Sequence, residues 1–322
     1  MQRAQGIAKS LRAASGIQNA ARPAIVGESQ VSDGFINRFG DRHASRQILQ
    51  QRMKSVSNIQ KITAAMKMVA ASRLRGAQTR AENSRGIWQP FTRLLGDCPD
   101  MDVPNDVTVA VSSDRGLCGG INSNIAKAVR GTMATLDTFE TADKEKKIVI
   151  VGEKCRSLLQ REYGANFVWS FVDTSKVPTT FTTVSLIADD ILKTEYDTLR
   201  ILYNKFKSAI TFVPSMVTLN SVEVTEKRAE TGGFLDKYEF DDDDRTATLK
   251  DIQEFQLACT LYNSMMENSC SELGSRVSAM DSSSKNAKEM KEKLTLLYNR
   301  SRQAAITTEL IEIISGASAL EG

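Results

Sequence analysis

The stretch after Pro214 contains no further proline and carries a strict seven-residue repeat of apolar residues. One ladder of this repeat consists of Met266, Leu273, Met280, Ala287 and Leu294. A second ladder, offset from the first by three residues, consists of Met290, Leu297, Ala304 and Ile311. Two apolar positions in every seven are typical of a coiled-coil seam. A helix over residues 249–318 is on the order of 100 Å long at 1.5 Å per residue, which a compact domain does not require. The pattern therefore predicts an extended coiled coil.

A second apolar stripe, nearer the N-terminus, supplies a partner for this helix. In the proline-free stretch 44–89, apolar residues recur every three or four positions. The stripe consists of Val56, Ile59, Ile62, Met66 and Val69. This spacing places the residues on one face of a helix, and Pro90 with the cluster from Gly96 to Pro104 marks the end of that helix. We expect the two helices to pair antiparallel and to bury both seams.

Between the two helices, short apolar strands alternate with helical stretches. The expected strands cover residues 107–113, 147–152, 167–172 and 198–203, and the expected helices cover 121–136, 154–163 and 182–195. Such alternation is typical of a parallel or mostly parallel sheet covered by helices. The predicted fold class is α/β, with a long antiparallel coiled coil formed by the N- and C-terminal helices and an inserted α/β domain. The predicted parts are a coiled-coil helix at 44–97, the α/β domain at 105–225, a polar connection at 226–248 and a coiled-coil helix at 249–322.

The usage of cysteine and histidine disfavours metal and thiol chemistry. The 322 residues include five cysteines, which are widely spaced and form no CxxC pair, and His43 is the single histidine. These features argue against a disulfide framework, a zinc site and a catalytic histidine. No stretch approaches the roughly 18 uninterrupted apolar residues that a membrane span requires. We predict no catalytic, cofactor-binding or metal-binding residues, and therefore no cofactor.

Residues 1–43 differ in composition from the rest of the chain. Four basic residues precede the first acid, Glu28, and serines and small residues fill the gaps. This composition is typical of a mitochondrial transit peptide. A plain disordered extension is the alternative interpretation.

Two segments invite a ligand-binding interpretation. Residues 112–124 (SSDRGLCGGINSN) place glycines between a strand and a helix, where phosphate groups often bind. The segment has no GxGxxG pattern and no lysine followed by serine or threonine, so a structural turn is the favoured interpretation. A nucleotide-dependent enzyme would need such a loop together with acid–base residues. The acidic run Asp241–Asp244 lacks the ligand spacing of an EF-hand and is interpreted as a solvated loop.

The N-terminal helix is strongly basic. Residues 46–93 carry ten lysines and arginines against one acid, Glu82. A basic helix binds nucleic acid or an acidic protein surface, or is simply solvated. Trp88 and Phe91 are the only aromatic residues available for stacking on bases, so an acidic protein partner is favoured over nucleic acid.

The C-terminal end of the chain is apolar around most of the helix circumference. The residues responsible are Ile306, Leu310, Ile311, Ile313 and Ile314. A helix that is apolar on nearly all sides is enclosed by other protein. Because the N-terminal helix is too short to accompany this end fully, we expect other chains to enclose it as an apolar bearing tip.

Four segments closely resemble the γ subunits of F-type ATP synthases. They are Ile59–Arg75 (IQKITAAMKMVAASRLR), residues 112–124, Met280–Arg302 and Asn299–Leu320 (NRSRQAAITTELIEIISGASAL). The resemblance covers residues 44–322 in the family's order and is closest to the mitochondrial members. It implies a Rossmann-like α/β domain and a non-catalytic central rotor, which couples proton-driven rotation of a c-ring to ATP synthesis at catalytic β subunits.

The resemblance also implies partners, location and residue roles. The implied partners are the α and β subunits, small central-stalk subunits of the δ/ε type and the c-ring, without nucleic acid. The implied location is peripheral, on the matrix side of the mitochondrial inner membrane. The residues implied to contact a β subunit are Met66, Lys67, Arg302, Gln303, Thr307 and Glu309. Leu310–Leu320 matches a tip held in an apolar sleeve, and Ala64 departs from the lysine of many family members.

Overall fold

The computed structural model describes residues 42–95, 104–137, 145–176, 179–232, 235, 238 and 245–321. The predicted transit peptide, apart from the first residues of the first helix, and the run Asp241–Asp244 lie outside the described residues. The chain divides into two compact units. The first unit contains the chain up to Thr63 and from Ser283 onward, and the second contains Ala64–Ser282.

The second unit is built on a five-stranded sheet with the order β3-β2-β1-β4-β5. The strands are β1 (Asn105–Val111), β2 (Glu145–Val151), β3 (Phe167–Phe171), β4 (Thr198–Phe206) and β5 (Phe212–Asn220). The first four strands pair in parallel, and β5 pairs antiparallel with β4. The predicted mostly parallel sheet is confirmed. Strand β5 was not predicted because it contains Pro214, which a sheet tolerates on an edge strand.

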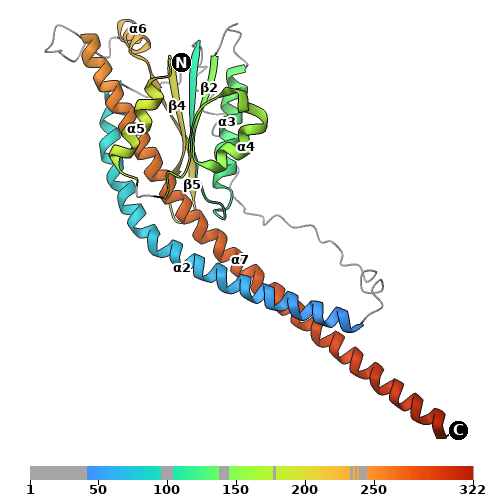
Figure 1. The fold of residues 1–322 in the computed structure, drawn as a ribbon. Helices are drawn as coiled ribbons and strands as arrows, with labels where there is room; N and C mark the ends of the chain where they lie inside the picture. The colour runs from blue at the N-terminus through green and yellow to red at the C-terminus, as the bar shows by residue number, and fades with distance from the viewer. Residues whose placement is uncertain are drawn as a thin grey trace. The chain divides into compact units, whose positions relative to one another are not determined.

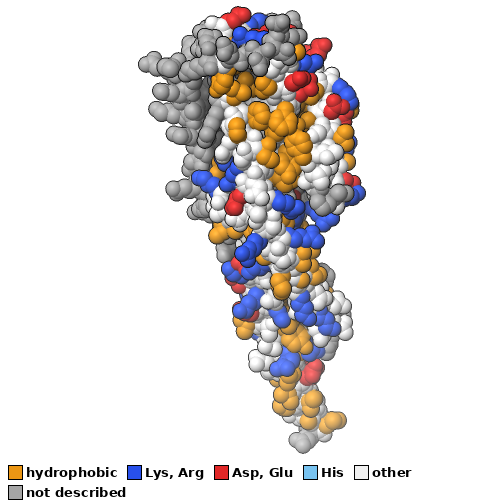
Figure 2. Space-filling view, turned by 90° about the vertical axis from the view of Figure 1, so that its left-hand side faces the viewer, with side chains coloured by type: hydrophobic (Ala, Val, Ile, Leu, Met, Phe, Trp, Pro, Cys, Tyr) orange, Lys and Arg blue, Asp and Glu red, His pale blue; other side chains and the backbone are white. Residues whose placement is uncertain are grey.

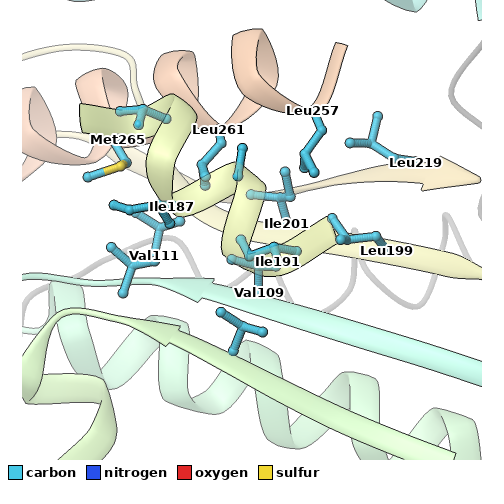
Figure 3. Packing of buried hydrophobic residues seen from close by; sticks show 14 of the residues in the cluster. Val109, Val111, Ile187, Ile191, Leu199, Ile201, Leu219, Leu257, Leu261 and Met265 are labelled. Carbon is cyan, nitrogen blue, oxygen red and sulfur yellow. The ribbon is translucent and has the colours of Figure 1, made fainter. Parts of the chain in front are cut away.

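Helices cover both faces of this sheet (Figure 1). On one face, α3 (Ile121–Asp137) and α4 (Glu153–Tyr163) bury a core with β1, β2 and β4. On the other face, α5 (Phe181–Leu192) and part of the last helix, α7 (Arg245–Glu321), bury a second core. Figure 3 shows Ile187 and Ile191 of α5 and Leu257 and Leu261 of α7 around the strand residue Ile201. A short 3-10 turn, η2 (Gly164–Asn166), follows α4.

The polar connection expected at 226–248 begins as a helix. Helix α6 covers Val222–Gly232, so residues 226–232 are helical rather than irregular. Its Ala229 is buried with Leu235 and Leu249 in a small cluster of its own. Apolar residues at the three- and four-residue spacing of a helix were too few in this stretch to predict α6 from periodicity.

The two long helices are α2 (Arg42–Leu95) and α7. Helix α2 continues through Pro90 for five further residues to Leu95, so the proline does not end it. Within the second unit, Lys67 Nζ lies 2.6 Å from Asp281 Oδ1, and Arg85 Nε lies 2.5 Å from Glu267 Oε1. From Lys67 to Arg85 the chain runs forward along α2, whereas their partners on α7 run backward from Asp281 to Glu267. The two helices are therefore antiparallel, as predicted.

The buried positions of α2 differ from the predicted stripe. Most of them form a ladder in steps of seven, which consists of Val56, Thr63, Ala70, Ala77 and Ser84, and Ala81 and Leu95 are also buried. Of the predicted stripe only Val56 is buried, whereas Ile59, Ile62, Met66 and Val69 are exposed. The structure therefore corrects the prediction at these four positions. The helix buries small and polar side chains that allow close approach, and the larger apolar residues lie outside the seam.

The first predicted ladder of α7 lies in its seam, and the second does not. Met266, Met280 and Ala287 are buried, and Leu273 and Leu294 are half-buried. The second ladder, Met290, Leu297, Ala304 and Ile311, is exposed. The enclosed positions follow the first ladder by four residues rather than three, and they are Ser284, Lys291, Tyr298 and Ala305.

On a helix, the residues three and four positions after a seam residue both lie next to it. The sequence favours the residues three positions on, because they are the more apolar of the two sets. In the first unit, Lys291 Nζ donates to Ser57 Oγ at 3.3 Å. The seam there is partly polar, so hydrophobicity alone selects the wrong neighbour.

Candidate functional site

The C-terminal end of α7 is an exposed apolar surface, which we call the apolar end and define as residues 306–320. Every residue from Glu309 to Leu320 is exposed. Ile306, Leu310, Ile311, Ile313 and Ile314 have exposed fractions of 47%, 53%, 58%, 68% and 63%. Figure 2 shows hydrophobic side chains on the surface of this part of α7. A contiguous exposed apolar surface marks a site of interaction with other protein.

Polar residues predicted to contact a partner surround the start of the apolar end. Arg302, Gln303, Thr307 and Glu309 are all exposed. Thr307 Oγ1 donates to the carbonyl of Gln303 at 3.0 Å, which is a local helix contact. Their side chains are therefore directed to solvent, next to an apolar surface of the same helix.

Met66 and Lys67 belong to the second unit, and the other predicted contact residues belong to the first. Met66 is exposed, as are the nearby Met68 and Val69. Lys67 is half-buried and forms the ion pair with Asp281. An exposed methionine pair beside a paired lysine presents an adaptable apolar surface, and the structure leaves it uncovered.

A buried polar junction in the second unit was not predicted. The Glu267 carboxylate accepts hydrogen bonds from Arg85 Nε at 2.5 Å, from Arg85 Nη2 at 3.2 Å and from the backbone N–H of Phe206 at 2.8 Å. Ser84 Oγ donates to Asn263 Oδ1 at 3.0 Å. The bond to Glu267 raises the pKa of Arg85, which keeps the guanidinium charged. These contacts join α2, α7 and the end of β4.

The sequence does contain a sign of this junction, because polar residues occur in the part of α7 that carries the heptad repeat. Glu267 directly follows Met266 of the first ladder. A carboxylate buried at such a position requires a partner, because an unpaired buried charge is very costly. Periodicity alone did not identify Arg85 as that partner.

The glycine-rich turn 112–124 has the features of a structural turn. Gly119 has φ of +64°, where glycine is favoured. Ser275 Oγ of α7 donates to the carbonyl of Cys118 at 2.5 Å. The amide of Asn122 donates to Ser113 Oγ at 2.8 Å. The turn therefore fastens the start of α3 to β1 and to α7.

The described ranges contain no group of three or more His, Cys, Asp or Glu residues that could hold a metal ion. In the same ranges, no helix is long and apolar enough to cross a membrane.

Comparison with known proteins identifies relatives over almost the whole chain. A family model described as ATP synthase matches residues 45–320. The mitochondrial ATP synthase subunit gamma of Ipomoea batatas is 53% identical over 309 residues, which cover 94% of this chain and 93% of that protein. The mitochondrial ATP synthase F(1) complex subunit gamma of Rattus norvegicus is 41% identical over 277 residues, with 84% and 97% coverage.

Two solved structures have the same fold. A chain from the central stalk and c-ring structure of the Tetrahymena thermophila mitochondrial ATP synthase matches with a TM-score of 0.56 and 27% identity, and the match covers 69% of this chain and 98% of that chain. A chain from the OSCP/F1/c-ring structure of the Euglena gracilis mitochondrial ATP synthase matches with a TM-score of 0.74 and 17% identity, and covers 86% and 95%. At 17% identity the second match shows the fold alone.

Proposed function

The chain belongs to the γ-subunit family of ATP synthases, and from this premise we propose that it is the central rotor of a mitochondrial F-type ATP synthase. In this proposal the subunit couples rotation of a proton-driven c-ring to conformational change and ATP synthesis at catalytic β subunits. It performs no bond chemistry itself. Its relatives at 53% identity are mitochondrial proteins, which supports a mitochondrial location. We place it peripherally on the matrix side of the inner membrane.

The observation that carries this proposal is the apolar end of α7, which no described part of the chain covers. Burial of apolar surface stabilises by roughly 25 cal/mol per Å², so this end favours a complex in which other chains enclose it. We propose that a ring of α and β subunits encloses Ile306, Leu310, Ile311, Ile313 and Ile314. Arg302, Gln303, Thr307 and Glu309 would then contact a β subunit, as would Met66 and Lys67.

The remaining partners are assigned to the α/β domain in the second unit. A structural relative at 27% identity occurs in an assembly described as central stalk and c-ring. We propose that this domain, at 105–225, docks onto small central-stalk subunits of the δ/ε type and onto the c-ring, with no role for nucleic acid. The coiled-coil helices at 44–97 and 249–322 would form the shaft, with 226–248 as the connection.

The mechanism requires unequal contacts. A rotor changes the state of a β subunit only if its contacts with the open and closed states differ in free energy. Moving such an equilibrium from 1:99 to 99:1 takes about 5.5 kcal/mol of differential contact. Exposed residues of different kinds, such as methionine, arginine and isoleucine, would offer different contacts to successive β subunits as the rotor turns.

The test is a cross-link in the assembled complex. A cysteine is introduced by the substitution Ile311→Cys. Cys98 is replaced by serine, and the four other cysteines can stay because they are buried. We expect a bismaleimide to link this cysteine to a neighbouring catalytic-head subunit and to stop ATP turnover. The control Lys127→Cys, on the exposed face of α3, is expected to form no such link to the head. Absence of the link, together with free amide exchange at residues 306–314 in the complex, would refute the proposal.

A second measurement tests the absence of catalysis. The purified chain alone is expected to hydrolyse no ATP, and its addition to a ring of α and β subunits is expected to restore rotation-coupled turnover. ATP turnover by the isolated chain that survives removal of contaminating ATPases would contradict a purely mechanical role.

A further inference from the structure

The second unit contains a cavity of about 640 Å³ at the carboxyl ends of its parallel strands. Its wall includes Val111 at the end of β1 and Val151 at the end of β2. The loop after β3 contributes residues 174–176, and α2 and α7 close the other sides. In open α/β sheets, ligands bind outside the carboxyl ends of the strands, near the point where strand order reverses. Here the order reverses between β1 and β4, and of these two strands only β1 contributes to the wall.

The floor of this cavity is held in place by Asp114. Its carboxylate accepts hydrogen bonds from the backbone N–H groups of Glu153, Asp173 and Ser175 at 3.2, 3.1 and 3.1 Å. It also accepts a bond from Ser175 Oγ at 2.9 Å. These bonds join the loops that follow β1, β2 and β3. The carboxylate is therefore committed to the protein backbone, and the loops around the cavity are preorganised.

Cationic side chains outnumber carboxylates around the cavity by five to two. Two of the cations have partners, because Arg276 bonds to Glu272 and Lys176 bonds to Asp173. Burial raises the pKa of Glu272, and Arg276 opposes that shift. Among the described residues, no ion pair is formed by the other three cations, which are Arg73, Arg80 and Arg115.

We infer that this cavity is a binding site for a phosphate-bearing anion. Unpaired arginines present planar sets of N–H donors that match phosphate oxygens. Hydroxyl groups also line the wall, but most of them donate within the chain: Ser72 to the carbonyl of Val69, Ser113 to the carbonyl of Arg115, and Thr174 and Ser175 to the Asp114 carboxylate. The donors that remain for a ligand are therefore chiefly the arginines. The volume lies within the range of small-molecule sites. The start of the glycine-rich turn forms part of the wall, and it contributes Arg115.

This inference does not depend on the rotor function, because it concerns the second unit alone. The shared chemistry is the phosphate group, and its source is either inorganic phosphate or a nucleotide. A recess of about 640 Å³ at the strand ends favours such a small anion over an acidic segment of another protein, which would need only exposed arginines and no recess.

The test is calorimetric titration of the full-length chain at low ionic strength. Orthophosphate, pyrophosphate, ADP and ATP are used as separate probes, each against a titration with sodium chloride of equal ionic strength. We expect saturable binding with one site per chain for at least one phosphate probe, weakened by added salt because the arginines are exposed. Orthophosphate or pyrophosphate binding as tight as ATP binding identifies an inorganic ligand, and tighter binding of ADP or ATP identifies a nucleotide.

Variants locate the site. Arg73→Gln, Arg80→Gln and Arg115→Gln are each expected to weaken binding by about tenfold, the loss typical of one charge-assisted hydrogen bond. The matched control is Arg75→Gln, because Arg75 is exposed on the same helix but does not line the cavity. The control is expected to bind within about twofold of the unchanged chain, since only the general charge is altered.

Three results would overturn the inference. The first is no saturable binding of any probe, and the second is an equal loss in Arg75→Gln, which would indicate general charge attraction. The third is an acidic segment of a neighbouring subunit filling the cavity in the assembled complex. Circular dichroism of each variant confirms the fold, and the exposed positions of the three arginines make unfolding unexpected.

Discussion

At the scale of single residues, the charged side chains that contribute most to stability are those that are buried and paired. Glu267 is 1% exposed and has three hydrogen bonds. Asp106 and Arg200 form a second buried pair between β1 and β4, with Oδ2 and Nη2 2.6 Å apart. Exposed ion pairs contribute little to stability, whereas breaking a buried pair leaves an uncompensated charge.

Replacing Glu267 by alanine is expected to destabilise the chain by about 3 kcal/mol. The change leaves the Arg85 guanidinium and the Phe206 N–H without their partner. Urea unfolding followed by circular dichroism measures the loss. The control Glu289→Ala, at an exposed position of α7, is expected to change stability by less than about 0.5 kcal/mol. Equal effects of the two changes would contradict the role of the junction.

Buried cysteines are expected to be unreactive in the folded chain. Burial raises the pKa of Cys155 and Cys270 to about 12 and that of Cys259 to about 11. Only the thiolate reacts readily, so modification at pH 8 should be slow until urea unfolds the chain. The measurement is the rate of reaction with a disulfide reagent, in a Cys98→Ser background. Fast modification of the folded chain at pH 8 would contradict the assigned burial.

The same shifts give a pH dependence with a definite sign. The folded chain holds these protons above the pH at which the unfolded thiols lose theirs, near 9. Their contribution is therefore fully present below pH 9 and is lost as pH rises toward 11 or 12.

The exposed apolar residues at the end of α7 could be anticipated from the sequence, whereas the buried pair of Glu267 and Arg85 could not. The isoleucines of the apolar end were found because they surround a helix on all sides, which one chain cannot cover. Glu267 and Arg85 were missed because their pairing joins residues far apart in sequence. The partner of a buried charge depends on tertiary register, and periodicity carries no information about it.

At the scale of elements, the seam of α2 is built from small residues. Ala77 and Ala81 pack against Met266, Cys270 and Phe206. Large apolar residues were expected in the seam because they dominate the hydrophobic signal. Alanine at the contact allows two backbones to approach closely, which a search for large side chains does not reveal. Strands β1 to β4 and helices α3, α4 and α5 were predicted because their turn residues and periods agree, whereas β5 and α6 were missed.

Overpacking the seam tests its register. Ala81→Leu is expected to destabilise the chain by about 2 kcal/mol, because the alanine is fully buried. Val69→Ala, on the exposed face that the sequence had indicated, is expected to cost less than about 0.5 kcal/mol. Urea unfolding of both variants gives the comparison. A larger loss in Val69→Ala would restore the predicted stripe as the seam.

The turn between β2 and α4 gives a second test. Gly152 has φ of +104°, and a Cβ there would lie 2.7 Å from Ser112 Oγ and 2.8 Å from its backbone. Gly152→Ala is therefore expected to cost about 3 kcal/mol or more. Gly131→Ala, within α3 and with nothing within 4 Å, is expected to stabilise by up to about 1 kcal/mol. Thermal unfolding separates the two, and a tolerated Gly152→Ala would refute the close approach.

At the scale of the whole molecule, the described chain does not bury all of its large apolar side chains. The sheet domain buries both of its cores, whereas the apolar end of α7 remains open to solvent. The family and the fold followed from sequence because motifs and heptads extend over most of the chain. What covers the apolar end did not follow, since a single chain does not contain its partner.

Self-association of the isolated chain tests whether the exposed apolar end is available for contact. We expect the unchanged chain to associate with increasing concentration, and Ile311→Gln combined with Ile314→Gln to reduce association markedly, because apolar contact drives it. Sedimentation velocity over a range of concentrations gives the result. Leu186→Gln, a single exposed leucine on α5, serves as the control. Unchanged association in the double variant would show that another surface is responsible.

The open end of α7 also has a consequence for the life of the protein in the cell. A newly synthesised chain whose apolar end is exposed is a target for chaperones and proteases. Surplus copies are therefore expected to be short-lived, and, if the proposed α and β partners enclose this end, their lifetime should lengthen when those subunits are made in step. The same surface that permits assembly thus limits how many unassembled copies persist.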